Sequence, residues 1–257
     1  MSIIHSIILG LLEGLTEFLP ISSTAHLDVA RQLLGVADVD FAKSFEIIIQ
    51  LGAVLAVVVL YWRKFSQGFW ANTAKILTAF APTALVGLLL YKIIKIFLLG
   101  NNIIMAAALG LGGLVLILWP YKQEADEVAE PVSAISYRQA LIIGCCQSLA
   151  VVPGVSRAAA TIIGGLALKI KRATIVEFSF LLAVPTMLAA GGWDIIKSGL
   201  TFTSGQISLL IIGFVVAFVS ALAAVKFLIN YIKKHNFVAF GWYRLAAAAA
   251  LLWWIIR

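Results

Sequence analysis

Long apolar segments dominate this chain, and their length constrains the fold more than any other feature. Six of them approach the roughly 20 residues that a helix needs to cross about 30 Å of hydrocarbon. Hydrophobic residues make up 62% of the 257 residues and charged residues only 12%, and a soluble domain of this size cannot bury so much apolar surface. We therefore expect an all-α integral membrane protein with about six transmembrane helices, at residues 45–62, 76–97, 103–119, 176–195, 207–229 and 237–256.

Two further apolar segments contain residues that a straight transmembrane helix does not tolerate. Residues 3–34 include Pro20 and several polar side chains, and residues 140–168 include Pro153. Because proline ends or kinks a helix, each segment is expected to break near its middle. Non-helical backbone at membrane depth is tolerated only inside protein or beside a watery cavity. The two segments are therefore predicted to be re-entrant helical hairpins.

The two broken segments also match each other at an offset of 134 residues, with the pairs Gly10 and Gly144, Glu13 and Gln147, Leu15 and Leu149, and Ser22 and Ser156. We interpret the chain as one membrane domain made of two repeats, approximately residues 1–120 and 137–257, joined by an aqueous loop at 121–136. Three spans separate the hairpins, and this odd number predicts an inverted-topology repeat.

The charge of the chain suggests an orientation. The net charge is +7, and in a membrane protein such an excess marks cytoplasmic loops and anionic lipid headgroups. No basic stretch is interleaved with aromatic residues, so we expect membrane lipids and not nucleic acid as partners. With most basic loops inside, the first hairpin enters from outside and the second from inside, so that they meet near the middle of the membrane at a site that opens to the outer face.

Glu13 and Glu17 are the first candidate site residues. They lie four residues apart in a predicted helix, so their carboxylates share one face. A carboxylate in an apolar segment costs at least about 2.5–3.5 kcal/mol on insertion scales, so it needs a partner or a wet cavity. Paired carboxylates invite a divalent cation, and Mg²⁺ and Ca²⁺ prefer oxygen ligands. A proton-carrying or merely buried pair is the alternative interpretation.

A run of hydroxyl residues, Ser22-Ser23-Thr24, follows Pro20 and is itself followed by His26. Serine and threonine are common helix N-caps, so these residues could simply begin a second half-helix. A helix N-terminus also suits a phosphate, because it offers free N–H groups and the positive end of the helix dipole. His26 lies three residues after Ser23, and a hydroxyl beside an imidazole can be an activated nucleophile.

Arg157 follows the turn-forming sequence Pro153-Gly154-Val155-Ser156. A guanidinium cannot become neutral by losing its proton, so inside a membrane segment it needs an anion. The candidates are one of the two carboxylates or a phosphate, which arginine binds through two hydrogen bonds. Gly154 would let the backbone approach a ligand closely. Arg244, in the last span, is expected to be a structural partner or to reach the membrane interface.

These residues are compatible with two classes of function. Carboxylates, hydroxyls, an imidazole and a guanidinium at two broken helices fit metal-assisted phosphoryl chemistry on a membrane-embedded substrate. Inverted repeats with broken helices fit an ion-coupled secondary transporter or a lipid flippase equally well. The residue types and their spacing leave both possibilities open.

Four stretches carry a resemblance to a known family. They are EGLTEFLPISSTAH at residues 13–26, PGVSR at 153–157, FEIIIQLGAVLAVV from Phe45 and EFSFLLAVP from Glu177. In these stretches the chain resembles the undecaprenyl-diphosphatase family, the bacitracin-resistance membrane phosphatases, and the resemblance extends across nearly the whole chain. It implies a hydrolase of the bacterial inner membrane that removes the terminal phosphate of undecaprenyl diphosphate, the carrier lipid of cell-wall synthesis.

The resemblance also implies roles for the site residues. Glu13 and Glu17 would hold the divalent cation, Mg²⁺ or Ca²⁺, and Glu17 would help to orient the attack. Ser23 would be the nucleophile and His26 its proton-transfer partner, although His26 or a metal-bound water could be the nucleophile instead. The diphosphate would be bound by Ser22, Thr24, Gly154, Ser156 and Arg157. The aromatic-rich last span could pack against a second copy in a homodimer.

The chain departs from the family pattern in one place. The family usually reads PGxSRSG, whereas Ala158 and Ala159 follow Arg157 here. A hydroxyl and a flexible glycine are therefore missing beside the residues that would bind the phosphate. This departure suggests a third hypothesis, a catalytically silent binding protein.

Overall fold

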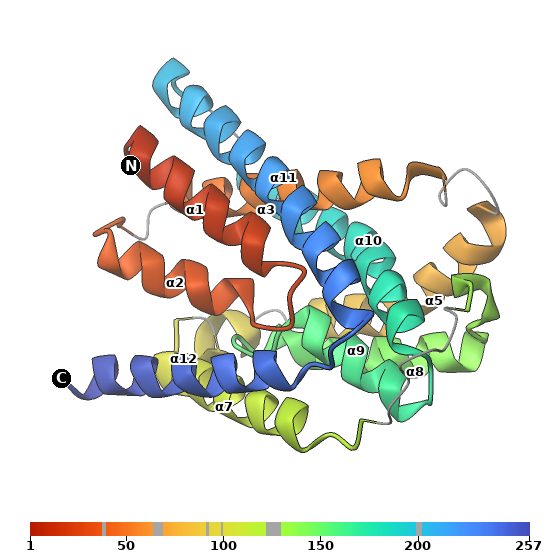
Figure 1. Ribbon diagram of the computed structural model, residues 1–257. Helices are drawn as coiled ribbons and strands as arrows, with labels where there is room; N and C mark the ends of the chain where they lie inside the picture. The colour runs from red at the N-terminus through yellow and green to blue at the C-terminus, as the bar shows by residue number, and fades with distance from the viewer. Residues whose placement is uncertain (38–39, 64–68, 91–92, 99, 122–129, 199–201) are drawn as a thin grey trace.

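The computed structural model describes residues 1–37, 40–63, 69–90, 93–98, 100–121, 130–198 and 202–257 (Figure 1). Within these ranges the regular structure is helical, with no strand, which confirms the all-α prediction. In chain order the elements are α1 (Ile3–Thr16), α2 (Ser23–Leu33), α3 (Asp40–Leu60), α5 (Phe69–Leu89), the π-helix η1 (Ile94–Leu98), α7 (Asn102–Leu118), η2 (Val132–Ala134), α8 (Tyr137–Ser148), η3 (Leu149–Val151), α9 (Arg157–Ala167), α10 (Arg172–Ser198), α11 (Ser204–Ile232) and α12 (Val238–Ile256).

Five helices in the described ranges are long and apolar enough to cross a membrane: Asp40–Leu60, Asn72–Leu89, Arg172–Gly192, Ser204–Ile232 and Val238–Ile256. They confirm a multi-pass membrane protein. The sixth expected span, at 103–119, is the apolar helix α7, which has 17 residues. At 1.5 Å per residue this helix is about 26 Å long, a little short of the hydrocarbon thickness. Most of the predicted loop at 121–136 lies outside the described residues.

Both predicted hairpins are broken helices. In the first, α1 ends at Thr16 and α2 begins at Ser23; in the second, α8 ends at Ser148, a short 3₁₀ turn follows, and α9 begins at Arg157. Adding 134 to Ile3, Ser23 and Leu33 gives Tyr137, Arg157 and Ala167, the corresponding bounds of the second hairpin. The two segments are thus built alike, while the inverted orientation of the repeats stays a prediction.

The sequence starts equivalent helices in the same way. Ser2 caps α1 and Ser136 caps α8, each through its side chain, and each cap backbone N–H is satisfied in return by the side chain of the third helical residue. Such a capping box satisfies two backbone donors that a helix start leaves free. Pro20 and Pro153 then lie in the breaks, where no helical hydrogen bond is required of them.

The hairpins pack across the two halves of the chain. Helix α1 lies along α11 from the second half, and α8 lies along α5 from the first half (Figure 1). Glycine allows both close contacts: a Cβ built on Gly10 would lie 2.6 Å from the carbonyl oxygen of Gly213, and one on Gly144 would collide with the carbonyl oxygen of Ala79. These two contacts are also related by the offset of 134 residues.

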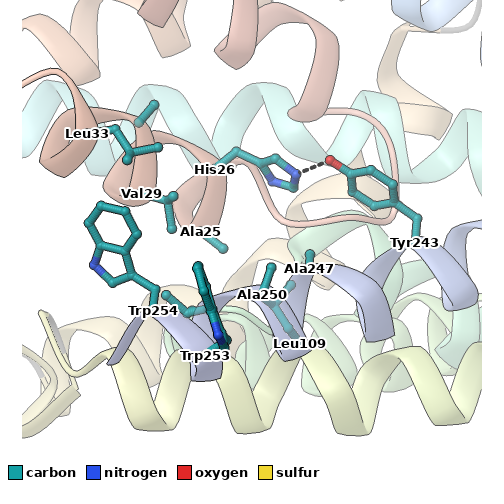
Figure 2. A pocket seen from close by; sticks show the side chains of 12 residues that line it. Ala25, His26, Val29, Leu33, Leu109, Tyr243, Ala247, Ala250, Trp253 and Trp254 are labelled. Carbon is teal, nitrogen blue, oxygen red and sulfur yellow. Dashed lines mark hydrogen bonds between the residues drawn. The ribbon is translucent and has the colours of Figure 1, made fainter. Parts of the chain in front are cut away.

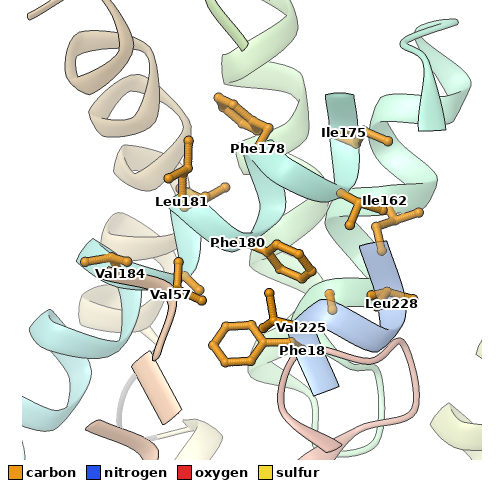
Figure 3. Packing of buried hydrophobic residues seen from close by; sticks show 14 of the residues in the cluster. Phe18, Val57, Ile162, Ile175, Phe178, Phe180, Leu181, Val184, Val225 and Leu228 are labelled. Carbon is orange, nitrogen blue, oxygen red and sulfur yellow. The ribbon is translucent and has the colours of Figure 1, made fainter. Parts of the chain in front are cut away.

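A buried apolar cluster packs against the break between α1 and α2. Phe18, which directly follows Glu17, is fully buried against Phe180 in an edge-to-face contact with ring centroids 5.5 Å apart. Val57, Leu181 and other side chains from α3, α9, α10 and α11 complete this cluster (Figure 3). The outward-facing leucines and isoleucines of the long helices stay exposed, as lipid contact requires.

Because the helices pack so closely at their glycines, adding one methyl group there should destabilise the fold. Gly144→Ala should lower the free energy of unfolding by about 1–3 kcal/mol, because the added Cβ has no room against the α5 backbone. Thermal unfolding of the detergent-solubilised protein measures the change. The matched control is Gly205→Ala, where the new Cβ meets nothing within 4 Å. Equal unfolding temperatures for the two variants would contradict this packing.

Candidate active site

The two breaks meet at Glu17. Arg157 Nη2 donates to Glu17 Oε1 at 3.0 Å, although the two residues are 140 positions apart in the chain. Ser23 Oγ donates to the other carboxylate oxygen, Oε2, at 2.5 Å. The side chains of Arg157 and Glu17 are only 9% and 3% exposed. Glu17 therefore links the predicted nucleophile and the predicted anion-binding residue in one hydrogen-bonded group.

The guanidinium of Arg157 is held in a fixed position by the second half of the chain. Its Nη1 donates to the carbonyl oxygen of Ser179 at 2.8 Å and to the hydroxyl of Ser179 at 3.2 Å. The Ser179 hydroxyl is in turn 2.6 Å from Thr161 Oγ1, and the guanidinium lies over the Phe18 ring. Nε has no partner among the described residues, so the guanidinium keeps a free donor.

Ser179 and Thr161 also belong to this group, although their positions in the amino-acid sequence did not mark them as site residues. Both are fully buried, on α10 and α9. The available signal was weak: Thr161 lies one helical turn after Arg157, and Ser179 is the polar residue inside the apolar stretch EFSFLLAVP. Neither spacing nor composition could show that the two hydroxyls contact each other.

Glu13 lies one helical turn before Glu17 and is fully buried. Neither of its carboxylate oxygens has a hydrogen-bond partner among the described residues. The like charges of Glu17 and Glu46 act on it as well. A buried carboxylate in such surroundings requires either a proton or a cation, so Glu13 fits both the predicted cation ligand and the alternative of a proton-carrying pair.

The backbone at the two breaks is strained in the same way. Ser22 and Ser156 both have a φ angle of 71°, a left-handed conformation that residues other than glycine rarely adopt. Each precedes the first residue of a half-helix, and the Ser156 hydroxyl caps α9 by accepting from the N–H of Ala159. Backbone strain of this kind is concentrated at functional sites.

One cavity of about 890 Å³ joins the two breaks. It is lined by most of the predicted site residues, namely Glu17, Ser22, Ser23, Thr24, Gly154, Ser156 and Arg157, whereas Glu13 and His26 are not among its lining residues. The first residues of α2 and of α9 both reach it, so the positive ends of two helix dipoles act on this cavity. The charged part of the cavity can therefore receive an anion.

Gly154 has a reason for being glycine that the sequence did not show. Its φ angle is 93°, and a Cβ there would collide with the carbonyl oxygen of Met105 on α7. The glycine thus permits close packing against α7, whereas the sequence suggested approach to a ligand.

Ala158 and Ala159 are buried and do not line the cavity, so the departure from the family pattern removes no group from its wall.

His26 is not where the sequence predicted. Its Nδ1 lies 2.7 Å from the carbonyl oxygen of Ser22, and its Nε2 lies 2.6 Å from the hydroxyl of Tyr243 on α12. The hydroxyl of Ser23 donates to Glu17, so a carboxylate lies beside the hydroxyl that the resemblance pairs with His26 for proton transfer. The physical reason is the four-residue spacing, which turns the imidazole back onto the carbonyl of Ser22.

His26 instead lines a second pocket, of about 370 Å³, between α2 and α12 (Figure 2). The other residues that line it are mainly apolar, including Val29, Leu109 and Trp254. This pocket has no lining residue in common with the cavity at the two breaks.

Arg244 is a structural residue, one of its two expected roles. It is fully buried, and its guanidinium donates to five backbone carbonyl oxygens, those of Pro20, Ala108, Leu109, Gly154 and Val155. The first of these lies in the first break and the last two lie in the second. A single side chain from α12 therefore fastens both breaks to α7.

Gln147 was matched to Glu13 by the repeat but was given no role. It is fully buried at the cavity, and its amide nitrogen donates to Thr83 Oγ1 at 2.9 Å and to Thr186 Oγ1 at 3.2 Å. Both threonine hydroxyls donate to backbone carbonyl oxygens, so they must act as acceptors toward Gln147. The position that carries a carboxyl group in the first hairpin carries a neutral amide in the second.

The buried ion pair predicts strong coupling between its partners. Glu17→Gln or Arg157→Met alone should cost about 3–5 kcal/mol of unfolding free energy, because each leaves an unpaired buried charge. The double variant should lose clearly less than the sum. Unfolding in mixed detergent micelles measures all three variants.

The surface pair of Lys171 and Glu130 is the matched control, since its side chains are 25% and 55% exposed. The same cycle of neutral substitutions there should give a coupling below about 1 kcal/mol. Similar coupling in the two cycles would show that the Glu17–Arg157 contact is not a buried ion pair.

Comparison with known proteins agrees with the motifs. A family model described as "Bacitracin resistance protein BacA" matches residues 6–250. An undecaprenyl-diphosphatase of Aquifex aeolicus (strain VF5) is 47% identical over 243 residues, which are 94% of this chain and 94% of that protein. Proteins with the same name from Sulfurihydrogenibium sp. (strain YO3AOP1) and Persephonella marina (strain DSM 14350 / EX-H1) are 47% and 46% identical, each over at least 99% of both chains.

The match extends along nearly the whole chain and includes both breaks, and it confirms the resemblance found in the motifs. The chain belongs to the bacitracin resistance protein BacA family.

Proposed function

We propose that this protein is an undecaprenyl-diphosphate phosphatase, which hydrolyses the terminal phosphate of the carrier lipid and leaves the monophosphate. The observation that carries the proposal is Glu17, which accepts hydrogen bonds from both Ser23 and Arg157 at the wall of one cavity. Phosphoryl transfer through a serine uses a hydroxyl nucleophile, a base beside it and a positively charged group held in place. Ser23, Glu17 and the guanidinium of Arg157 match these three roles. The names of the relatives support the same substrate.

The arrangement suggests a reaction in two steps. Ser23 Oγ attacks the terminal phosphorus while its proton passes to Glu17 Oε2, 2.5 Å away. The bond from phosphorus to the bridging oxygen breaks, and the polyprenyl monophosphate leaves with the proton from Glu17. Water then attacks the phosphoserine and gives a proton to Glu17, which returns it to Ser23 Oγ as inorganic phosphate departs.

Arg157 and the two helix N-termini stabilise the negative charge of the terminal phosphate during both steps. The ring nitrogens of His26 are engaged by Ser22 and Tyr243. This arrangement favours Ser23 over His26 as the nucleophile. In the same way, Glu17 is better placed than His26 to accept the proton of Ser23.

A divalent cation, Mg²⁺ or Ca²⁺, is part of the proposal. Glu13 would hold it through its two unpartnered oxygens, with Glu17 one turn away. No group of three or more His, Cys, Asp or Glu side chains in the described ranges could hold a metal ion. The remaining ligands would then be phosphate oxygens and water, as is usual for Mg²⁺. When bound, the cation would neutralise charge on the phosphate.

The cavity also suits a lipid. Beyond its charged part it is lined by apolar residues of α5 and α10, including Phe80, Leu88 and Met187. The first isoprene units of the substrate would lie against them while the rest of the chain stays in the bilayer. We place the protein in the bacterial inner membrane, with the headgroup entering from the outer face.

A second function, ion-coupled transport or lipid flipping, is favoured by one specific observation. The two hairpins have the same bounds at an offset of 134 residues and the same strained serine. Paired broken helices around a central site are typical of transporters. Lipid movement across proteoliposomes without phosphate release would favour this second function.

The phosphatase proposal predicts the behaviour of three variants. The purified protein should release phosphate from a polyprenyl diphosphate, and Ser23→Ala and Arg157→Met should each lower kcat by about 10²–10³. Ser208→Ala is the control, because that hydroxyl bonds only to the carbonyl of Ser204 in its own helix. Near-normal turnover by both site variants would exclude the proposed mechanism.

Metal dependence gives a separate prediction. Chelator should abolish phosphate release, and added Mg²⁺ or Ca²⁺ should restore it. Glu13→Gln should raise the cation concentration needed for half-maximal activity by at least about tenfold, since a ligand with two charged oxygens is lost. Undiminished turnover in chelator would rule out the cation.

A further inference from the structure

A chain of hydrogen bonds links α12 to the residue before the proposed nucleophile. Tyr243 OH lies 2.6 Å from His26 Nε2 (Figure 2). On the other side of the ring, His26 Nδ1 lies 2.7 Å from the carbonyl oxygen of Ser22. The rings of Tyr243 and His26 are nearly parallel, with an angle of 9° between them. The contacts thus connect a helix near the end of the chain to the first break.

The direction of these hydrogen bonds follows from the chemistry of the groups. A carbonyl oxygen only accepts, so His26 Nδ1 must carry a hydrogen. The pocket around the ring is mainly apolar, and the guanidinium of Arg244 opposes a second positive charge there. With Nδ1 as the donor to Ser22, a neutral ring leaves Nε2 without a hydrogen, and the Tyr243 hydroxyl then donates to it.

The hydrogen bonds from Tyr243 through His26 end at the carbonyl oxygen of Ser22. Ser22 has the strained φ angle of 71°, and its own side chain makes no capping hydrogen bond. Apart from the imidazole, the one donor to this carbonyl in the described part of the chain is the backbone N–H of His26, at a long 3.4 Å. The imidazole therefore supplies the shorter contact to a strained residue that directly precedes Ser23.

The second hairpin forms the same break without an imidazole. Ser156 has the same φ angle, but its hydroxyl caps the helix, and its carbonyl accepts from the backbone N–H of Ala160 at 3.0 Å. Ala160 is the residue that corresponds to His26 at the offset of 134. The pair of His26 and Tyr243 is thus not needed to make such a break, and it occurs in the hairpin that carries Ser23.

We propose that Tyr243 is a positioning residue: its hydroxyl donates to Nε2 and orients the imidazole, and the Nδ1–H of His26 holds the Ser22 carbonyl so that the Ser23 hydroxyl stays on Glu17. This inference rests on the proposed function, because it assigns a task within that site. In this proposal His26 holds Ser23 in position and does not transfer a proton.

The first test reads the tautomer directly and needs no activity. The chain has three histidines, so ¹⁵N-histidine labelling in lipid nanodiscs gives few signals, and His26→Asn identifies the one of interest. His26 should show a protonated Nδ1 and a bare Nε2. His5 is an internal reference for the other tautomer, because its Nδ1 accepts a hydrogen bond from the backbone N–H of Ser2 and therefore carries no hydrogen.

In Tyr243→Phe the ¹⁵N signal of the bare Nε2 should move, because this nitrogen loses the hydrogen bond from the tyrosine hydroxyl, while the His5 signal stays unchanged. A wild-type His26 with a protonated Nε2, or an Nε2 signal that does not respond to Tyr243→Phe, would overturn the proposal. This result stands even if the protein releases no phosphate, so it is distinguishable from failure of the proposed function.

The second test separates positioning from proton transfer by phosphate release. Tyr243→Phe should lower kcat about tenfold with little change in KM, the effect expected for the loss of one hydrogen bond. Tyr137→Phe, at an exposed tyrosine on α8, is the matched control and should behave as wild type.

His26→Asn and His26→Ala complete this test. The amide nitrogen of asparagine can replace Nδ1 as the donor to Ser22, whereas it cannot accept or release a proton as an imidazole does. His26→Asn should therefore keep at least about ten times the kcat of His26→Ala. Equal and severe loss in both variants would overturn the proposal and return proton transfer to His26.

Discussion

The buried contact between Glu17 and Arg157 is the interaction on which the rest of the site depends. Each charge would be strongly unfavourable by itself in an apolar interior, and together they require the two breaks to meet. Arg244 fastens the same two breaks through backbone carbonyls, so neither break can move without leaving a buried donor unsatisfied. The ion pair and Arg244 together turn two interrupted helices into one rigid wall around a cavity.

This rigidity has a chemical consequence. Phosphoryl transfer needs groups that are oriented before the substrate arrives, because reorganisation during the reaction would lower the rate. Ser179 and Phe18 fix the guanidinium, and Glu17 fixes the hydroxyl of Ser23. The carboxylate that neutralises Arg157 is thus also the group that would take the proton of Ser23 in the proposed reaction.

The two hairpins share one backbone but carry different chemistry. Ser23 and Arg157 occupy equivalent positions at the offset of 134, and so do Glu13 and Gln147. The first hairpin supplies the hydroxyl of Ser23 and the carboxyl groups of Glu13 and Glu17. The second supplies the guanidinium of Arg157 and the neutral amide of Gln147. A symmetric frame therefore holds an asymmetric site, as a reaction with one nucleophile and one leaving group requires.

Much of the architecture could be predicted from the amino-acid order. Apolar length predicted the membrane helices, Pro20 and Pro153 predicted the breaks, and the cost of charge in lipid identified Glu17 and Arg157, because these effects depend on local sequence and on the solvent. The partners of His26, the five carbonyls around Arg244 and the hydroxyls behind Arg157 could not be predicted. They depend on which faces of distant helices touch, and helix packing and side-chain direction decide that only in the folded chain.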